Sequence, residues 1–331
     1  MNSIASQTRV KFLTYNVWQE GTKVVNGLKK IEKTIVLVNP DVICFTEVRN
    51  YKNEDWTTKI QKALEKNGLY YYRGYAGGDV SVLSKYPISS PKLTGNGSVS
   101  TFKIEVKGKQ ILVAAAHLDY TQYACYLPRG YYGGIPSWKA IVNSDGELQK
   151  ETSVEKILAY NLSSKRDEQL TSFLESIKSE TIPVVLLGDF NEPSHLDWAE
   201  STRNLFDHNG LIVPWNNSIL LAKNGFKDAY RVRYPDPLKN PGFTWPSKAF
   251  KIKSTSWTPR SDERDRIDYV YYKGTDIRTL KAAIVGPKAS FVNNKLSTSY
   301  TKDELFIGQD LEWPSDHKAV LIELEFYIFH N

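Results

Sequence analysis

Short apolar runs that read as buried β-strands alternate along this 331-residue chain with segments of helical periodicity. The run 41–48 is almost continuously apolar, which is typical of a central strand that is covered on both faces. Residues 24–38 instead place apolar side chains at steps of four and three, on one face of a helix: Val24, Leu28, Ile31, Ile35 and Val38. This alternation predicts a layered α/β fold.

The other elements follow from the same two periodicities. We expect strands near 10–17, 69–75, 79–84, 99–106, 110–117, 183–189, 268–272 and 319–326, and helices near 56–67 and 165–178. The segment 120–164 is long for a connection between a strand and a helix, and its many tyrosines argue against disorder. We therefore expect one domain over residues 1–331, with a Tyr-rich insert at about 120–164.

The composition bounds the class of protein without fixing its partner. Hydrophobic residues make up 41% and charged residues 24%, and no apolar run is long enough for a transmembrane segment. The net charge of +6 suits an anionic ligand, but a charge of this size is equally explained by solubility. Two cysteines cannot form a disulfide framework, so the compartment stays unknown. We expect a soluble monomer that could be secreted after removal of a leader peptide.

Polar residues recur at the ends of the apolar strands, at five places along the chain. They are carboxylates, amides and imidazoles: Asn16, Glu47, His117, Asp119, Asp189, Asn191, Asp316 and His317. In layered α/β folds, neighbouring strand ends form a crevice that binds ligands. Such an oxygen-rich set suits a hard cation such as Mg²⁺. The sequence lacks the spacing of a structural zinc site, a nucleotide-binding P-loop and a serine-hydrolase elbow.

Seven short segments resemble motifs of the endonuclease/exonuclease/phosphatase superfamily, which includes deoxyribonuclease I, exonuclease III and bacterial sphingomyelinases. They are LTYNV at 13–17, FTEV at 45–48, LSKYPI at 83–88, HLD at 117–119, GDFN at 188–191, RIDYV at 266–270 and SDH at 315–317. Each is short, but in this order they span nearly the whole chain. The resemblance implies a four-layer α/β/β/α sandwich of two packed, mainly antiparallel sheets flanked by helices.

The resemblance also implies a metal-dependent phosphoester hydrolase. Glu47 is implied to be the main ligand of Mg²⁺ or Mn²⁺, assisted by Asn16, with Asp316 near the metal. Such a metal would supply Lewis acidity and position the phosphate. Asp119 is as well explained by hydrogen bonds to loop backbone.

The remaining motif residues are implied to handle water, phosphate and protons. Asp189 and Asn191 would hold and polarise the attacking water, and His117 would donate to a phosphate oxygen. Asp268 would orient His317, because a histidine that is paired with a carboxylate can be kept in one tautomer and protonated near neutral pH. The sequence leaves open whether Asp189 or His317 is the general base.

Substrate contacts are expected from the insert and from positions beside the core motifs. The candidates are Tyr126, Arg129 and Trp138 of the insert, together with His195 and Trp245. His195 could equally follow a helix cap at the preceding serine, and Trp245 could serve packing alone. A basic stretch at 248–266 would suit phosphate, or be a solvated loop. His208 and His330 are expected on the surface.

Three functions remain open at this point. The first is a phosphodiesterase or phosphatase acting on a small, lipid-linked or glycan-linked phosphate, which the insert and the modest charge favour. The second is a nuclease for DNA or RNA, which would need a continuous basic groove and salt-sensitive binding. The third is a catalytically silent binding module, against which the intact set of polar residues argues.

Overall fold

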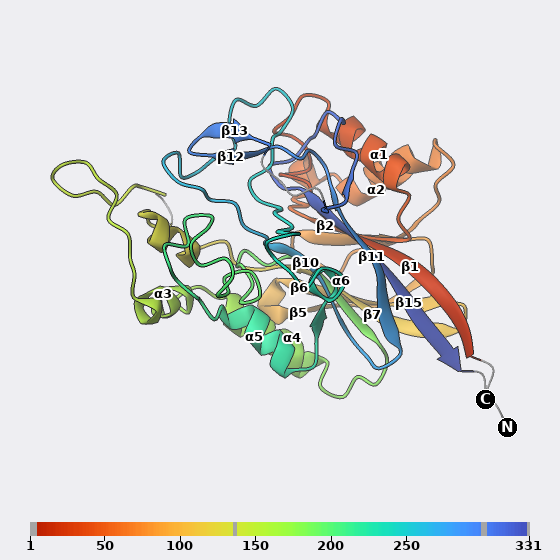
Figure 1. The fold of residues 1–331 in the computed structure, drawn as a ribbon. Helices are drawn as coiled ribbons and strands as arrows, with labels where there is room; N and C mark the ends of the chain where they lie inside the picture. Colours follow the sequence, from red (N-terminus) through yellow and green to blue (C-terminus); the bar gives the residue numbers. More distant parts are fainter. Residues whose placement is uncertain (1–4, 135–137, 299–302, 330–331) are drawn as a thin grey trace.

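The computed structural model describes residues 5–134, 138–298 and 303–329. Its strands form two main sheets, packed face to face with helices outside them, as Figure 1 shows. The first sheet has the order β14-β11-β15-β1-β2-β4-β3 and the second β5-β6-β7-β8-β10-β9. Neighbouring strands are antiparallel except for β1–β2, β11–β14 and β7–β8, which are parallel. The predicted sandwich of mainly antiparallel sheets is confirmed.

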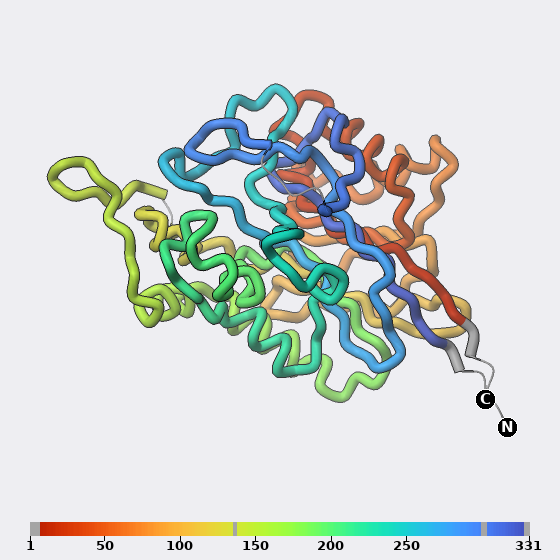
Figure 2. The backbone as a smooth tube through the Cα atoms, in the orientation of Figure 1, coloured from red at the N-terminus to blue at the C-terminus, as the bar shows by residue number. Residues whose placement is uncertain are grey.

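The first sheet comprises β1 (Ala5–Asn16), β2 (Val42–Thr46), β3 (Tyr72–Gly74), β4 (Val80–Ser84), β11 (Ile277–Val285), β14 (Phe306–Ile307) and β15 (Ala319–Phe329). The second comprises β5 (Ile88–Thr94), β6 (Val99–Val106), β7 (Lys109–His117), β8 (Val184–Asp189), β9 (Lys227–Asp228) and β10 (Asp268–Lys273). A separate hairpin joins β12 (Ser290–Val292) to β13 (Lys295–Ser297). In the backbone trace of Figure 2, β1 and β15 run side by side from the centre to the two chain ends.

The α-helices are α1 (Gly27–Val38), α2 (Trp56–Glu65), α3 (Val154–Asn161), α4 (Arg166–Ser176), α5 (Asn216–Lys223) and α6 (Ala229–Arg233). Single 3₁₀ turns lie at η1 (Tyr51–Asn53), η2 (Gly95–Gly97) and η3 (Ala124–Arg129). Helix α1 begins three residues later than its apolar period starts, because Val24 lies in a turn closed by Gly21. It ends as predicted, where Asn39 adopts a left-handed conformation before proline. None of the described helices is long and apolar enough to cross a bilayer.

Alternation of side chains along the strands builds the core. On β1, Val10 and Phe12 face the second sheet, whereas Leu13 and Tyr15 face α1 and α2. A third apolar cluster lies between the second sheet and α4, where Phe173 and Leu170 pack. Each sheet is thus buried on both faces, which accounts for the continuous apolar runs in the sequence.

The Tyr-rich insert packs against the fold through an apolar cluster of its own. Tyr123, Cys125 and Tyr126 are buried there against Trp198 and Trp215 from the segment that follows β8. The insert also contains α3, while its residues 135–137 lie outside the described part of the chain. In Figure 1 it forms the left-hand end of the molecule, with the loop 139–149 extending from it.

The topology brings several strand ends to one edge of the sandwich. Asp189, the last residue of β8, is directly opposite His117 of β7 on one side and Asp268 of β10 on the other. In the first sheet, β1 ends at Asn16 beside the end of β2, just before Glu47. Parallel and antiparallel pairings together therefore collect strand ends and strand beginnings at the same place.

Candidate active site

A cavity of about 270 Å³ opens at this edge of the sandwich. It is lined by six of the eight predicted metal-binding and catalytic residues: Glu47, His117, Asp189, Asn191, Asp316 and His317. Asn16 and Asp268 lie directly behind them and contact them through hydrogen bonds. The structure thus brings together all eight residues that the motifs assign to the metal and to catalysis.

Glu47 is held at the cavity by hydrogen bonds to both of its carboxylate oxygens. Oε1 accepts from Nδ2 of Asn16 at 3.2 Å, and Oε2 accepts from the backbone N–H of Gln19 at 2.8 Å. Nδ2 of Asn16 also donates to Oδ2 of Asp189 at 3.0 Å, while its Oδ1 accepts from the N–H of Trp18. Asn16 therefore links the two sheets and orients Glu47.

Asp316 is a buried carboxyl group at the edge of the cavity. Its Oδ1 has no hydrogen-bond partner within the described residues. Burial raises the pKa of Asp316 to about 8, with His317 opposing the rise and the nearby Glu47 adding to it. Two adjacent carboxylates, one of them unsatisfied, are a suitable oxygen donor set for a divalent cation.

His317 is fixed between two carboxylates. Its Nδ1 lies 3.0 Å from Oδ2 of Asp268, and its Nε2 lies 3.7 Å from Oδ2 of Asp189. Burial alone would lower the pKa of His317, but Asp268 and Asp189 outweigh burial and raise it to about 10. The imidazole is therefore protonated at neutral pH, with Nε2–H directed toward the cavity. Atoms of Asp189, Asp268 and His317 lie within 4.8 Å of one another. Because both ring nitrogens of the protonated imidazole carry hydrogens, His317 in this state can act as a donor but has no free lone pair for a metal.

His117 forms a second pair of the same kind, with a carboxylate that the sequence analysis did not identify. Its Nδ1 lies 2.9 Å from Oδ2 of Asp79, which also forms an ion pair with Arg49 at 2.9 Å. Burial would lower the pKa of His117, but Asp79 outweighs it and raises it to about 9. The Nε2 atom of His117 lies 3.8 Å from Oδ2 of Asp189. Asp79 immediately precedes β4, and β4 is antiparallel to β2, so its beginning lies beside the end of β2.

Replacing Asp79 with asparagine is expected to lower kcat roughly 10- to 100-fold, as for other groups that orient a site residue. The substitution removes the negative charge that keeps His117 protonated, so the pKa of His117 falls toward its usual value. The loss should grow from about pH 6 to about pH 9, which a pH–rate profile would detect. Asp145→Asn, in an exposed loop, serves as the control. An alkaline limb at the wild-type position in Asp79→Asn would show that this carboxylate does not act through His117.

Asp189 lies at the centre of the site. Its Oδ1 accepts from the backbone N–H of Asn191 at 2.9 Å, and the amide of Asn191 is fixed on the carbonyl of Leu118. Burial raises the pKa of Asp189 to about 6, with Asp268 adding to the rise and both histidines opposing it. The preceding Gly188 is required, because a Cβ there would lie 1.8 Å from the carbonyl oxygen of Ala116 on β7. Asp189 is thus ionised at neutral pH between two protonated imidazoles.

Of the five residues expected to bind substrate, Tyr126, Trp138 and Trp245 line the cavity. Arg129 does not, because it is fully buried in an ion pair with Asp265 and donates to the carbonyl of Phe206 at 3.1 Å. A buried guanidinium without a partner would be costly. Arg129, which we expected to contact substrate, instead joins the insert to the rest of the fold.

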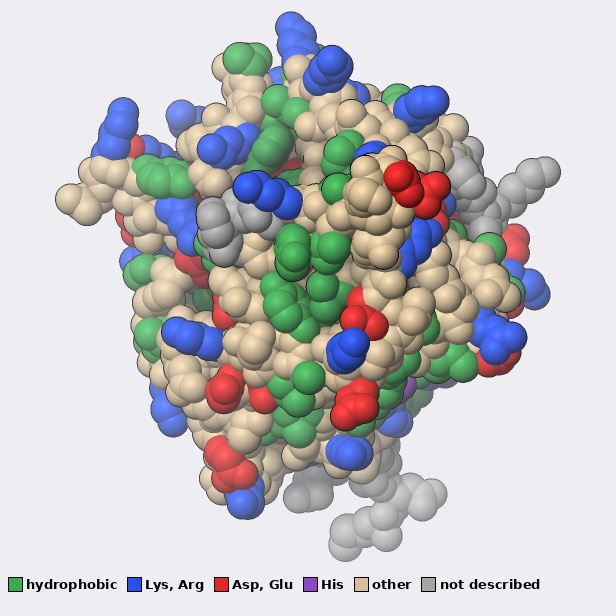
Figure 3. All heavy atoms as spheres, turned by 90° about the vertical axis from the view of Figure 1, so that its left-hand side faces the viewer, with side chains coloured by type: hydrophobic (Ala, Val, Ile, Leu, Met, Phe, Trp, Pro, Cys, Tyr) green, Lys and Arg blue, Asp and Glu red, His purple; other side chains and the backbone are tan. Residues whose placement is uncertain are grey.

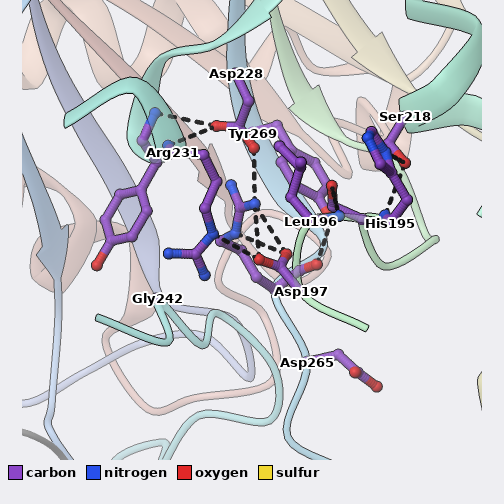
Figure 4. A network of polar contacts seen from close by, with 12 residues as sticks. His195, Leu196, Asp197, Ser218, Asp228, Arg231, Gly242, Asp265 and Tyr269 are labelled. Carbon is purple, nitrogen blue, oxygen red and sulfur yellow. Dashed lines mark hydrogen bonds and ion pairs between the residues drawn. The ribbon is translucent and has the colours of Figure 1, made fainter. Parts of the chain in front are cut away.

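His195 also lies away from this cavity, and Figure 4 shows it beside Ser218. Its Nδ1 lies 2.8 Å from Oγ of Ser218, and it lines a separate surface pocket. Beside it, Asp197 binds Arg231 at 2.7 Å and Arg266 at 2.8 Å. Within the basic stretch at 248–266, Arg266 is thus paired inside the protein and is not available to a phosphate.

Two smaller expectations can also be assessed. Asp119 accepts hydrogen bonds from the backbone N–H groups of Thr121 and Lys165 at 3.0 Å, so it stabilises the loop. The prediction for His208 is wrong: it is buried, with its ring stacked 3.7 Å from that of Trp198. His330 lies outside the described residues.

Comparisons with known proteins agree with this geometry. A sequence model described as "Endonuclease/Exonuclease/phosphatase family" matches residues 13–317. An uncharacterised protein of Caenorhabditis elegans is 28% identical over 326 residues, which span 98% of this chain and 94% of that protein.

Solved structures share the fold at low sequence identity. An endonuclease/exonuclease/phosphatase of Beutenbergia cavernae superposes with a TM-score of 0.54 at 17% identity, over 96% of this chain and 72% of that one. D. rerio TDP2, complexed with a single-strand DNA product, gives a TM-score of 0.54 at 13% identity, over 96% and 99%. At these identities the structures support the sandwich fold alone.

Proposed function

The chain belongs to the endonuclease/exonuclease/phosphatase family, and on this premise we propose that it hydrolyses phosphoesters with the help of a divalent cation. The observation that carries the proposal is Asp189, an ionised carboxylate held between two imidazoles that are each paired with a carboxylate of their own. The pKa of Asp189 lies below neutrality, and the pKa values of His117 and His317 lie above it. At neutral pH this arrangement supplies one base and two acids, as phosphoryl transfer requires.

Glu47 and Asp316 would hold the cation, Mg²⁺ or Mn²⁺. The two carboxyl groups are close enough for Glu47 to raise the pKa of Asp316, and Asn16 fixes the orientation of Glu47. When bound, the cation supplies Lewis acidity at a phosphoryl oxygen and positions the phosphate.

Asp189 would accept a proton from the attacking water. Its carboxylate borders the cavity and is ionised above its pKa of about 6, which a base at neutral pH requires. The backbone N–H of Asn191 holds Oδ1 in place, and Oδ2, which accepts from Asn16, lies nearest the two imidazoles. We assign the general base to Asp189 because His317, with its pKa of about 10, already carries its proton.

His117 and His317 would direct their Nε2–H groups at the phosphoryl oxygens. Both have pKa values above neutrality, so both present positive charge where negative charge accumulates in the transition state. One of them would also protonate the leaving oxygen. The residues that orient them, Asp79 and Asp268, keep each Nδ1 occupied so that each Nε2 faces the substrate.

A small phosphodiester or phosphomonoester fits this cavity better than a nucleic acid. Arg49 is the only lysine or arginine among the described lining residues, and it is paired with Asp79. Nucleic-acid grooves neutralise many phosphates with lysine and arginine. The alternative is a nuclease acting on single strands, which the likeness to the DNA-bound D. rerio structure favours at the level of fold.

Initial rates on a panel of substrates distinguish the two functions. With Mg²⁺ present, we expect release from bis(p-nitrophenyl) phosphate or p-nitrophenyl phosphate, and no cleavage of single-stranded DNA, plasmid DNA or RNA. Rapid cleavage of a nucleic acid at the same enzyme concentration would identify a nuclease. A protein that binds but turns over none of these substrates would support the silent binding module.

A further inference from the structure

Aromatic side chains contribute nearly half of the cavity lining: Trp18, Tyr120, Tyr123, Tyr126, Trp138, Trp245 and Trp257. Four of them form a continuous series, which we call the aromatic wall: Tyr126, Trp138, Trp257 and Trp245. Successive ring centroids in this series lie 5.6, 4.6 and 6.0 Å apart, and the interplanar angles are 82°, 71° and 71°. The wall ends at the catalytic set, where the ring of Trp245 lies 4.9 Å from that of His317.

A buried carboxylate holds the aromatic wall in place. Glu263 accepts from the hydroxyl of Tyr126 at 2.8 Å and from the backbone N–H of Trp257 at 3.1 Å. The hydroxyl of Tyr126 in turn accepts from Nε1 of Trp245 at 3.3 Å. Three segments distant in sequence are thereby locked together, so the wall is preorganised before any ligand arrives.

The arrangement of the rings limits what the wall can bind. The rings pack edge to face against one another and leave no space between them, so they do not form a cage for an alkylammonium group. Trp257 lines the cavity and keeps 40% of its surface exposed, so part of its indole is accessible to a ligand. On the face that carries the insert, Figure 3 shows hydrophobic side chains gathered near the middle. A flat ring can stack on such a surface without a complementary charge.

We infer that the aromatic wall is the subsite for the organic group of the phosphoester, and that this group is a single flat-faced ring, from a sugar or a nucleobase, that stacks on Trp257. Glu263 acts as a positioning residue for the wall. This inference rests on the proposed function, because it assigns the wall to a substrate whose phosphate lies at Asp189 and His317. It makes Trp257 a determinant of specificity.

Two esters with the same leaving group test the inference by kinetics. Phenyl p-nitrophenyl phosphate and methyl p-nitrophenyl phosphate both release p-nitrophenolate and differ only in the group that remains. For the wild type, the ratio of kcat/KM, corrected for the uncatalysed rates, should favour the phenyl ester about tenfold or more. Trp257→Ala should bring this ratio close to one, and Trp257→Phe should restore most of it.

Tyr132→Ala is the control, because Tyr132 is an aromatic residue that is 50% exposed, like Trp257 at 40%, but does not line the cavity. It should keep the wild-type ratio. Glu263→Gln should raise KM for the phenyl ester more than it lowers kcat. A phenyl preference that is absent in the wild type, or that survives Trp257→Ala, would overturn the inference.

The source of the ring is identified with two further p-nitrophenyl esters. If kcat/KM for thymidine 5′-(p-nitrophenyl phosphate) exceeds that for the methyl ester, the ring belongs to a nucleoside. If kcat/KM for glucose 6-(p-nitrophenyl phosphate) exceeds it, the ring belongs to a sugar. If neither exceeds the methyl ester, the inference fails.

Binding measurements separate this inference from the proposed function. In calorimetric titrations, phenyl phosphate should bind about tenfold or more tightly than methyl phosphate, and Trp257→Ala should remove the difference. If binding depends on Trp257 while no ester is hydrolysed, the ring subsite stands and the hydrolase proposal fails. Equal binding of the two phosphates to the wild type would overturn the subsite, whatever the protein hydrolyses.

Discussion

Replacing His317 with glutamine is expected to lower kcat on bis(p-nitrophenyl) phosphate by about 10²- to 10⁴-fold, the usual contribution of a positioned acid–base group. Glutamine fills the site and still donates a hydrogen bond, but it carries neither a proton to transfer nor a positive charge. The wild-type imidazole has both, because Asp268 and Asp189 keep it protonated. The measurement is kcat at saturating Mg²⁺, with thermal unfolding recorded on the same samples.

His195→Gln is the matched control for this substitution. His195 is a partly buried histidine outside the cavity, so its replacement should leave kcat near the wild-type value. A His317→Gln protein that is folded and retains more than about a tenth of the wild-type kcat would remove His317 from the catalytic set.

Replacing Glu47 with glutamine should lower the Mg²⁺-dependent rate by about 10³-fold or more, because a metal ligand contributes several kcal/mol of transition-state stabilisation. A second readout does not depend on turnover. Mg²⁺ should raise the Tm of the wild type, since a ligand that binds only the folded state stabilises it, and this rise should vanish in Glu47→Gln.

Without metal, the Glu47→Gln protein should be at least as stable as the wild type. The substitution removes one negative charge from beside Asp316, whose own carboxylate is buried and unsatisfied. Glu105→Gln, at an exposed position on β6, is the control for both readouts. A metal-induced rise in Tm that persists in Glu47→Gln would place the cation elsewhere.

Periodicity predicted the strands well where both faces are buried. The predicted bounds of β6 match the structure, and those of β7, β8 and β10 differ by a residue. β5 and β11 were missed, because β5 is largely exposed and β11 alternates irregularly between buried and exposed residues. Their places in the sheets depend on neighbours distant in sequence, which a local pattern does not contain.

Polar residues at strand ends identified most of the candidate site, and the limits of that argument are instructive. It found Glu47, which directly follows a buried strand, and Asp189, which ends one. It missed Asp79 because the strand expected at 79–84 includes this residue, and only antiparallel pairing with β2 brings the start of β4 to the same edge. Arg129 was misplaced because its partner, Asp265, is 136 residues away in the chain. Pairing across such distances decides whether a charge is buried or free to bind substrate.

The central claim is most directly tested by the rate of bis(p-nitrophenyl) phosphate hydrolysis before EDTA treatment, after it, and after Mg²⁺ or Mn²⁺ is restored to the same wild-type sample. We predict that hydrolysis stops with EDTA and returns with the cation, while thermal unfolding shows that the protein stays folded throughout. A rate that EDTA does not change, or no hydrolysis under any of these conditions, would contradict a divalent-metal-dependent phosphoester hydrolase.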